Sequence, residues 1–214
     1  MRESGLERGL GRPFGGEARS WPPVPRLWPG ETICIIASGP SACRDDAEFV
    51  RGKCRVIVVN TSYRLAPWAD LLYACDAKWW WAYEPQFQGL TVSQDARAPE
   101  SVLRVPSINE PGLSLDPMVI HQGGNSGYQA LNLAVLLGVR RILLLGYDMQ
   151  GGDHWHGAHP PGLVSLTDKA TARWRENFGT TLPDLERANV EVVNCSRQTA
   201  LTCFPRMSFE DALA

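Results

Sequence analysis

The stretch GGNSGYQALNLAVLLGVRRILLLGYD, residues 123–148, decides the fold class of this chain. Three glycines mark its opening turn, and the apolar spacing that follows predicts a helix over 128–137 with one apolar face. Gly138 ends that helix, and the nearly continuous apolar run over 140–146 is typical of a buried strand in a parallel sheet. A helix leading into a buried strand predicts a parallel sheet covered by helices.

The same alternation extends outward in both directions. Short apolar runs predict further strands over residues 32–37, 55–60, 71–75 and 190–194. Helices are expected after Ser41, which can cap the first of them, near 78–83, and over 168–188 with a break near Gly179. We therefore expect an α/β protein: one doubly wound, mostly parallel sheet with helices on both faces, in a single Rossmann-like domain.

Residues 1–30 differ from the rest of the chain. They are rich in arginine, glycine and proline and have neither helical nor strand periodicity. This composition predicts a disordered or extended arm ahead of a domain spanning residues 31–214. The alternative is an arm that packs across a neighbouring subunit of a homo-oligomer through Trp21 and Trp28.

Charge and hydropathy exclude some classes of protein. With a net charge of −2, the chain has no excess of positive charge, which disfavours a main role in binding nucleic acid or an anionic membrane. DNA stays open as an acceptor substrate. No apolar run approaches the roughly 20 residues that span a bilayer. The N-terminus lacks the pattern of a secretion signal and the six cysteines include no C-x-x-C pair, so we expect a cytoplasmic protein with free thiols.

Small polar and acidic residues follow five of the predicted strands. They are Ser38, Gly39 and Ser41 after the first strand, Asn60 and Thr61 after the second, Asp76 after the third, Asp148 after the strand at 140–146, and Asn194 and Ser196 after the last. Open parallel sheets bind ligands outside the carboxyl ends of their strands. We therefore expect the loops after the first three strands and after the strand at 140–146 to converge on one anion-accepting pocket.

Two glycine-containing turns are candidate phosphate cradles. Ser38-Gly-Pro-Ser41 would place backbone N–H groups and two hydroxyls at the start of a helix, with an ordinary β-turn as the alternative. In the second turn, Gly124, Asn125, Ser126 and Gly127 would let a ligand approach the backbone, and either Asn125 or Ser126 could cap the helix. Neither turn matches G-x-G-x-x-G or the P-loop, which disfavours NAD, FAD and kinase-type ATP sites.

Three of the four histidines fall within residues 154–159. We favour a loop over the site that supplies one general acid or base. Metal ligation together with Asp148 or Asp153 is a second interpretation, and a solvated histidine-rich loop is a third.

These motifs occur in an order that resembles the bacterial sialyltransferases of glycosyltransferase family 42 and related phage and bacterial proteins. The resemblance covers roughly residues 32–205 and is carried by Ala37-Ser-Gly-Pro-Ser41, Asn60, Asn125-Ser-Gly127, Leu145-Gly-Tyr-Asp148 and Val193-Asn-Cys-Ser196. It implies a nucleotide-sugar donor contacted by Gly39, Ser41, Asn60, Ser126 and Gly127. It also implies a loop histidine, His159 or His156, as general base on an acceptor hydroxyl, and no obligatory metal.

The chain departs from that family by being shorter between the glycine-rich turn and the late strand, so the donor and acceptor stay open. A second hypothesis is a nucleotide or pterin pyrophosphate-transfer enzyme, which would hold Mg²⁺ on Asp76 and Asp148. A third is a non-catalytic nucleotide-binding or assembly protein that uses the tryptophans and the N-terminal arm to hold partners.

Overall fold

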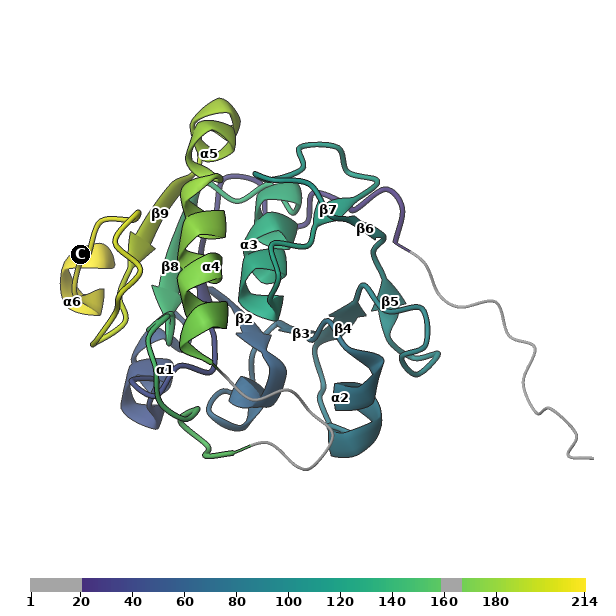
Figure 1. Cartoon of the computed structure of the whole chain (residues 1–214), viewed down its shortest axis with the longest axis horizontal. Helices are drawn as coiled ribbons and strands as arrows, with labels where there is room; N and C mark the ends of the chain where they lie inside the picture. Colours follow the sequence, from purple (N-terminus) through teal and green to yellow (C-terminus); the bar gives the residue numbers. More distant parts are fainter. Residues whose placement is uncertain (1–20, 159–166) are drawn as a thin grey trace, which may run out of the picture.

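The computed structural model describes residues 21–158 and 167–214 (Figure 1). Its centre is a seven-stranded sheet, all parallel, in the order β5-β4-β3-β2-β1-β8-β9. The strands are β1 (Thr32–Ile36), β2 (Arg55–Val59), β3 (Leu71–Tyr73), β4 (Leu90–Ser93), β5 (Leu103–Arg104), β8 (Arg141–Leu145) and β9 (Glu191–Asn194). The predicted α/β class with a parallel sheet is confirmed.

Helices cover both faces of the sheet. Successive strand residues point to opposite sides, and because they are apolar on both sides, each face is buried beneath helices. Ile33 and Ile35 join the core beneath one set of helices, while Cys34 and Ile36 join the core beneath the other. The first set is α3 (Ser126–Leu136), α4 (Asp168–Gly179) and α5 (Leu182–Ala188). The second is α1 (Arg44–Val50), the 3-10 turn η1 (Asn60–Arg64), α2 (Ala77–Tyr83) and α6 (Phe209–Ala212). The expected break between two helices near Gly179 is confirmed.

The order in which strands are added to the sheet reverses at β1. Strands β1 to β5 are added one after another on one side, and the chain then returns through α3 to place β8 on the other side of β1. A crevice at the carboxyl ends of β1 and β8 is the usual ligand site of such sheets.

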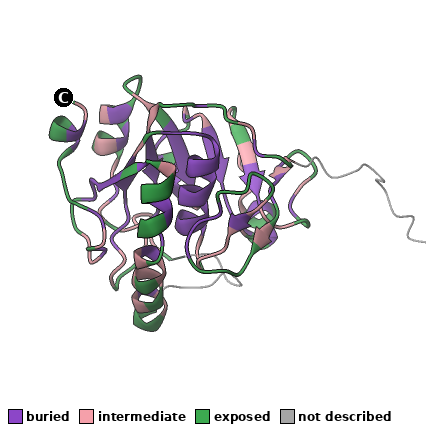
Figure 2. Cartoon of the chain, turned by 90° about the horizontal axis from the view of Figure 1, so that it is seen from above, coloured by how far each residue is buried: buried purple, intermediate pink, exposed green. Residues whose placement is uncertain are grey.

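Helix α3 differs from its prediction. One apolar face was expected, yet all its residues from Ser126 to Leu136 are buried, and Figure 2 shows a buried helix running through the middle of the molecule. The polar side chains are accommodated by hydrogen bonds: Asn132 accepts the N–H groups of Ser114 and His121 at 3.0 and 2.8 Å. Those partners belong to a segment containing β6 (Ser107–Ile108) and β7 (Ile120–His121), a two-stranded parallel sheet that the sequence did not predict.

The described part of the expected N-terminal arm, residues 21–30, contains no helix or strand and packs on its own domain. Val24 and Trp28 are buried in the core, and the Trp28 N–H donates to the Leu137 carbonyl at 3.0 Å. The folded core thus includes residues ahead of the expected domain start at residue 31. Within residues 21–158 and 167–214, no helix is long and apolar enough to cross a bilayer.

Candidate functional site

A cavity of about 500 Å³ opens at the carboxyl ends of β1, β2, β3 and β8, between the first turns of α3 and α4. Nine residues that the sequence singled out line it: Ser38, Gly39, Asn60, Asp76, Gly124, Asn125, Ser126, Gly127 and Asp148. A volume of this size is typical of sites for nucleotide-sized ligands.

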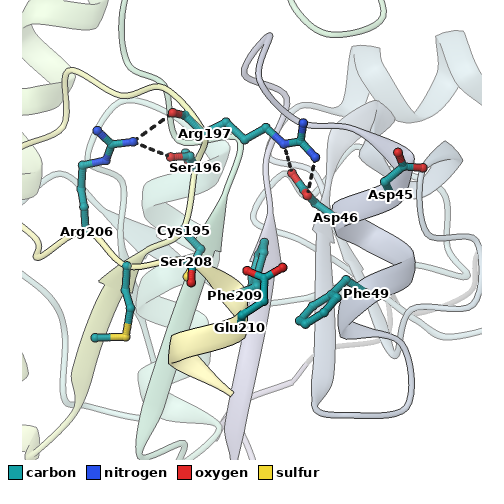
Figure 3. Close-up of a pocket in the computed structure, with 11 residues that line it drawn as sticks. Asp45, Asp46, Phe49, Cys195, Ser196, Arg197, Arg206, Ser208, Phe209 and Glu210 are labelled. Carbon is teal, nitrogen blue, oxygen red and sulfur yellow. Dashed lines mark hydrogen bonds and ion pairs between the residues drawn. The ribbon is translucent and has the colours of Figure 1, made fainter. Parts of the chain in front are cut away.

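A second cavity, of about 630 Å³, lies between α1, the segment after β9, and α6 (Figure 3). Both of its arginines are engaged, one with a carboxylate and the other with the backbone. Arg197 holds Asp46 through two bonds of 2.8 Å, and Arg206 donates to the carbonyls of Ser196 and Arg197 (Figure 3). Since these contacts fasten the C-terminal segment to α1, we assign this cavity a structural role and place the candidate site in the first cavity.

The turn after β1 does not form the expected phosphate cradle, because its donors are used inside the protein. Gly39 donates its N–H to the Gly146 carbonyl at 2.9 Å, and Pro40 has no N–H. Ser41 gives both its N–H and its hydroxyl to Asp148, each at 2.8 Å. Ser41 is consequently not the cap of α1, whose N-cap residue is Cys43.

Asp148 explains this arrangement. Its side chain is buried, at 1% exposure, and a buried carboxylate needs hydrogen-bond donors. Burial raises the pKa of Asp148, while the two bonds from Ser41 act in the opposite direction. Asp148 therefore joins β8 to the turn after β1 and shapes the floor of the cavity.

Ser41→Ala is expected to lower the free energy of unfolding by about 1–3 kcal/mol, because Asp148 loses a charge-assisted donor. The effect should be full at pH values well above the native pKa of Asp148, which burial raises, and should shrink as the pH falls through that pKa. Urea denaturation at several pH values measures it, with the exposed Ser101→Ala as the matched control. An equal, pH-independent loss in both variants would contradict this role of Asp148.

The ends of β2 and β3 meet the first turn of α3. The Ser126 hydroxyl lies 3.4 Å from the Asn60 side-chain oxygen and 3.3 Å from the Cys75 N–H. Asn60 has a left-handed backbone, φ 51°, which turns the chain sharply at the end of β2. Thr61, in contrast, is fully buried and bonds Trp79 Nε1 at 3.3 Å, so it does not line the cavity.

The glycine-rich turn before α3 needs a left-handed backbone that glycine adopts readily. Gly123 and Gly124 have φ of 52° and 86°, and a side chain on Gly123 would collide with the Tyr128 ring. These two glycines are thus required by the turn itself, with or without a ligand. Asn125 is the cap of α3, since its oxygen accepts the Tyr128 N–H at 2.9 Å.

Two buried donors in the cavity wall have no protein partner within the described part of the chain. They are Asn125 Nδ2 and Trp174 Nε1. A buried N–H without an acceptor costs free energy that a ligand oxygen would recover. The N–H groups of Ser126 and Gly127 begin α3 and have no acceptor within that helix. These donors, from α3 and α4, make this part of the cavity suitable for an anion.

The histidine loop places His154, rather than His156, in the cavity wall. His154 Nδ1 lies 3.1 Å from the Ser38 carbonyl, so in the neutral ring Nδ1 carries the proton and Nε2 carries the lone pair. The His156 ring stacks on the His154 ring at 5.1 Å. The other candidate, His159, lies outside the described residues.

Burial lowers the pKa of His154 below its ordinary value, although the bond to the Ser38 carbonyl and the charge of Asp153 oppose this. A neutral imidazole at pH 7 is the form that can accept a proton. Within residues 21–158 and 167–214, no three His, Cys, Asp or Glu side chains are grouped to hold a metal ion. Asp76 and Asp148, the suggested magnesium ligands, both line the cavity, but both oxygens of Asp148 already accept bonds from Ser41.

No protein-family model matches this chain, and no curated protein matches it. The site must therefore be judged on its own geometry.

That geometry adds residues that the sequence did not single out: His154 as the ring facing the cavity, Trp174, Gln94 and Gln122. The histidine cluster was a signal for the first. Nothing local marks the other three, because only the folded chain brings α4 and the ends of β4 and β7 to the cavity.

Proposed function

We propose that the protein is a transferase that binds a nucleotide-activated sugar in this cavity and passes the sugar to an acceptor hydroxyl. The observation that carries the proposal is the placement, in one cavity, of a neutral histidine and a set of N–H donors without protein acceptors. The order of motifs shared with glycosyltransferase family 42 supports the same reaction class.

His154 takes the part of the general base. Its Nδ1–H is held by the Ser38 carbonyl, so Nε2 accepts the proton of the acceptor hydroxyl as the new glycosidic bond forms. The bond between the sugar and the phosphate oxygen breaks, and the electron pair leaves with the phosphate.

The departing phosphate is stabilised by donors of the α3 turn and of α4. Asn125 Nδ2, Trp174 Nε1 and the first N–H groups of α3 are fixed in place before the reaction, which is the arrangement that favours developing negative charge. This proposal moves the phosphate site from the turn after β1, where the sequence also placed it, to the α3 turn.

Trp174→Phe is expected to weaken binding of a nucleoside diphosphate about 5- to 20-fold, since one hydrogen bond to a charged group is lost while the aromatic ring is kept. Binding of the parent nucleoside, which lacks phosphate, should change little. Isothermal titration calorimetry of both ligands measures the difference, with the exposed Trp81→Phe as control. Equal losses for nucleoside and diphosphate would remove Trp174 from the phosphate site.

The proposed function is tested by ligand-induced thermal stabilisation with CMP-, UDP- and GDP-linked sugars, each with and without EDTA. We expect stabilisation that persists in EDTA. In the presence of candidate acceptors, we also expect the nucleotide to be released as its sugar is transferred. Stabilisation that is lost in EDTA would favour the magnesium-dependent pyrophosphate-transfer alternative. Binding without turnover of any donor would favour the non-catalytic alternative, and no stabilisation by any nucleotide would overturn the proposal.

A further inference from the structure

Two glutamines in the cavity wall, Gln94 and Gln122, are joined through one hydroxyl group. The Ser107 hydroxyl donates to Gln94 Oε1 and accepts from Gln122 Nε2, the latter at 3.1 Å. Gln94 directly follows β4, Gln122 directly follows β7, and Ser107 begins β6. The small β6–β7 sheet therefore brings Gln122 beside the end of the main sheet.

The shared hydroxyl dictates what the two amides offer a ligand. A hydroxyl has one proton, so it can donate to one amide oxygen only; here it donates to the oxygen of Gln94 and accepts from the nitrogen of Gln122. Gln94 is then left with its N–H₂ group, a donor, and Gln122 with its oxygen, an acceptor; neither group has a partner within the described residues. Turning both amides over exchanges these roles but still leaves one donor and one acceptor.

The backbone beside Gln122 is held firmly. Its N–H donates to the Ile108 carbonyl at 3.0 Å, and its carbonyl accepts from Gln129 Nε2 at 3.0 Å. Gln129 is itself buried and accepts the Tyr73 hydroxyl at 2.7 Å. A donor and an acceptor side by side on a rigid frame are suited to a planar ligand edge that carries an acceptor next to a donor.

We propose that Gln94 and Gln122 form the base-recognition subsite of the cavity and bind the Watson–Crick edge of the nucleobase. Every nucleobase has an acceptor beside a donor on that edge, in a position and order that depend on the base. Ser107 is a positioning residue that keeps the two amides in opposite roles. This inference rests on the proposed function, because it supplies the subsite for the nucleotide part of the donor.

The test uses Gln94→Glu and Ser107→Ala in the full chain, with AMP, CMP, GMP, UMP and ribose 5-phosphate as probes in titration calorimetry. A glutamate at 94 has no N–H, so Ser107 must donate to it and the subsite offers two acceptors. We expect binding of the preferred nucleotide to weaken about 10- to 100-fold, with ribose 5-phosphate unaffected. Gln88→Glu, the same change at an exposed position outside the cavity wall, should bind like the wild type.

Ser107→Ala removes the restraint without adding charge, so both amides can rotate. In this variant, we expect the ratio of the affinities for the preferred and the other nucleotides to fall about 10-fold, with a smaller loss of affinity for the preferred one. If Ser107 had a purely structural role, binding of all four nucleotides would weaken equally. Melting temperatures confirm that each variant is folded.

The outcomes separate the two proposals. Wild-type nucleotide binding and base preference that survive in both variants would overturn the subsite and leave the proposed function standing. If Gln94→Glu weakened the binding of ribose 5-phosphate as much as that of the nucleotides, this would also overturn the subsite. A wild-type protein that binds none of the four nucleotides would overturn both proposals.

Discussion

His154→Gln is expected to slow sugar transfer about 10²- to 10⁴-fold while nucleotide binding is retained. Glutamine keeps an N–H donor on a polar side chain, but it has no basic nitrogen to accept the proton of the acceptor hydroxyl. Single-turnover transfer rates and nucleotide titrations on the same preparation measure the two effects.

The matched control is His121→Gln. His121 Nδ1 lies 2.9 Å from the Gly112 carbonyl, so it makes a similar bond, but the residue does not line the cavity. If His154→Gln kept the wild-type rate while His156→Gln or His159→Gln lost it, the base would be one of the two histidines that the family resemblance indicates.

The rate of transfer should also depend on pH in a defined direction. Since burial lowers the pKa of His154, the ring is neutral at pH 7 and the rate is already at its plateau there. As the pH falls, the rate should decline with a midpoint below the ordinary histidine pKa of about 6.5. A midpoint above that value would contradict the assignment of a buried neutral His154 as base.

Gly146→Ala is expected to lower the free energy of unfolding by about 2–5 kcal/mol. Gly146 has a φ of 71°, a conformation that costs an alanine free energy, and the added Cβ would lie 2.5 Å from the Ala37 carbonyl oxygen. Gly146 directly follows β8, beside the end of the neighbouring strand β1 at the cavity floor. A loss of stability of this size should lower Tm by roughly 5–15 °C.

Gly179→Ala is the control within the same protein. Gly179 ends α4 without a left-handed φ, and an added Cβ there has no atom within 4 Å. Its stability should stay unchanged or rise by up to about 1 kcal/mol, because alanine favours helix. Equal destabilisation in both variants would show that Gly146 has no special constraint.

Local sequence patterns were sufficient for five strands of the main sheet and for most helices, because burial of a strand or of one helix face depends on residues close together in the chain. They were insufficient for α3. Its apolar spacing predicts one buried face, but the segment that contains β6 and β7 packs on a further side of it. Asn132 is accommodated by the backbone of Ser114 and His121 in that segment.

The roles of individual site residues needed the folded chain. Ser41 is a good candidate for a helix cap or a phosphate ligand when only its neighbours are considered. In the structure it serves Asp148, 107 residues away. A carboxylate buried at the end of one strand takes the donors of another loop, and no short-range pattern encodes that competition.

The sequence by itself determined the α/β class, the strands whose carboxyl ends carry polar side chains, and hence the edge of the sheet where a ligand would bind. Only the tertiary structure decided which donors stay available at that edge, that His154 faces the cavity, and that Trp174, Gln94 and Gln122 join it. The physical reason is that hydrophobic periodicity is a local property. Satisfying a buried hydrogen-bonding group depends on whichever distant segment packs against it.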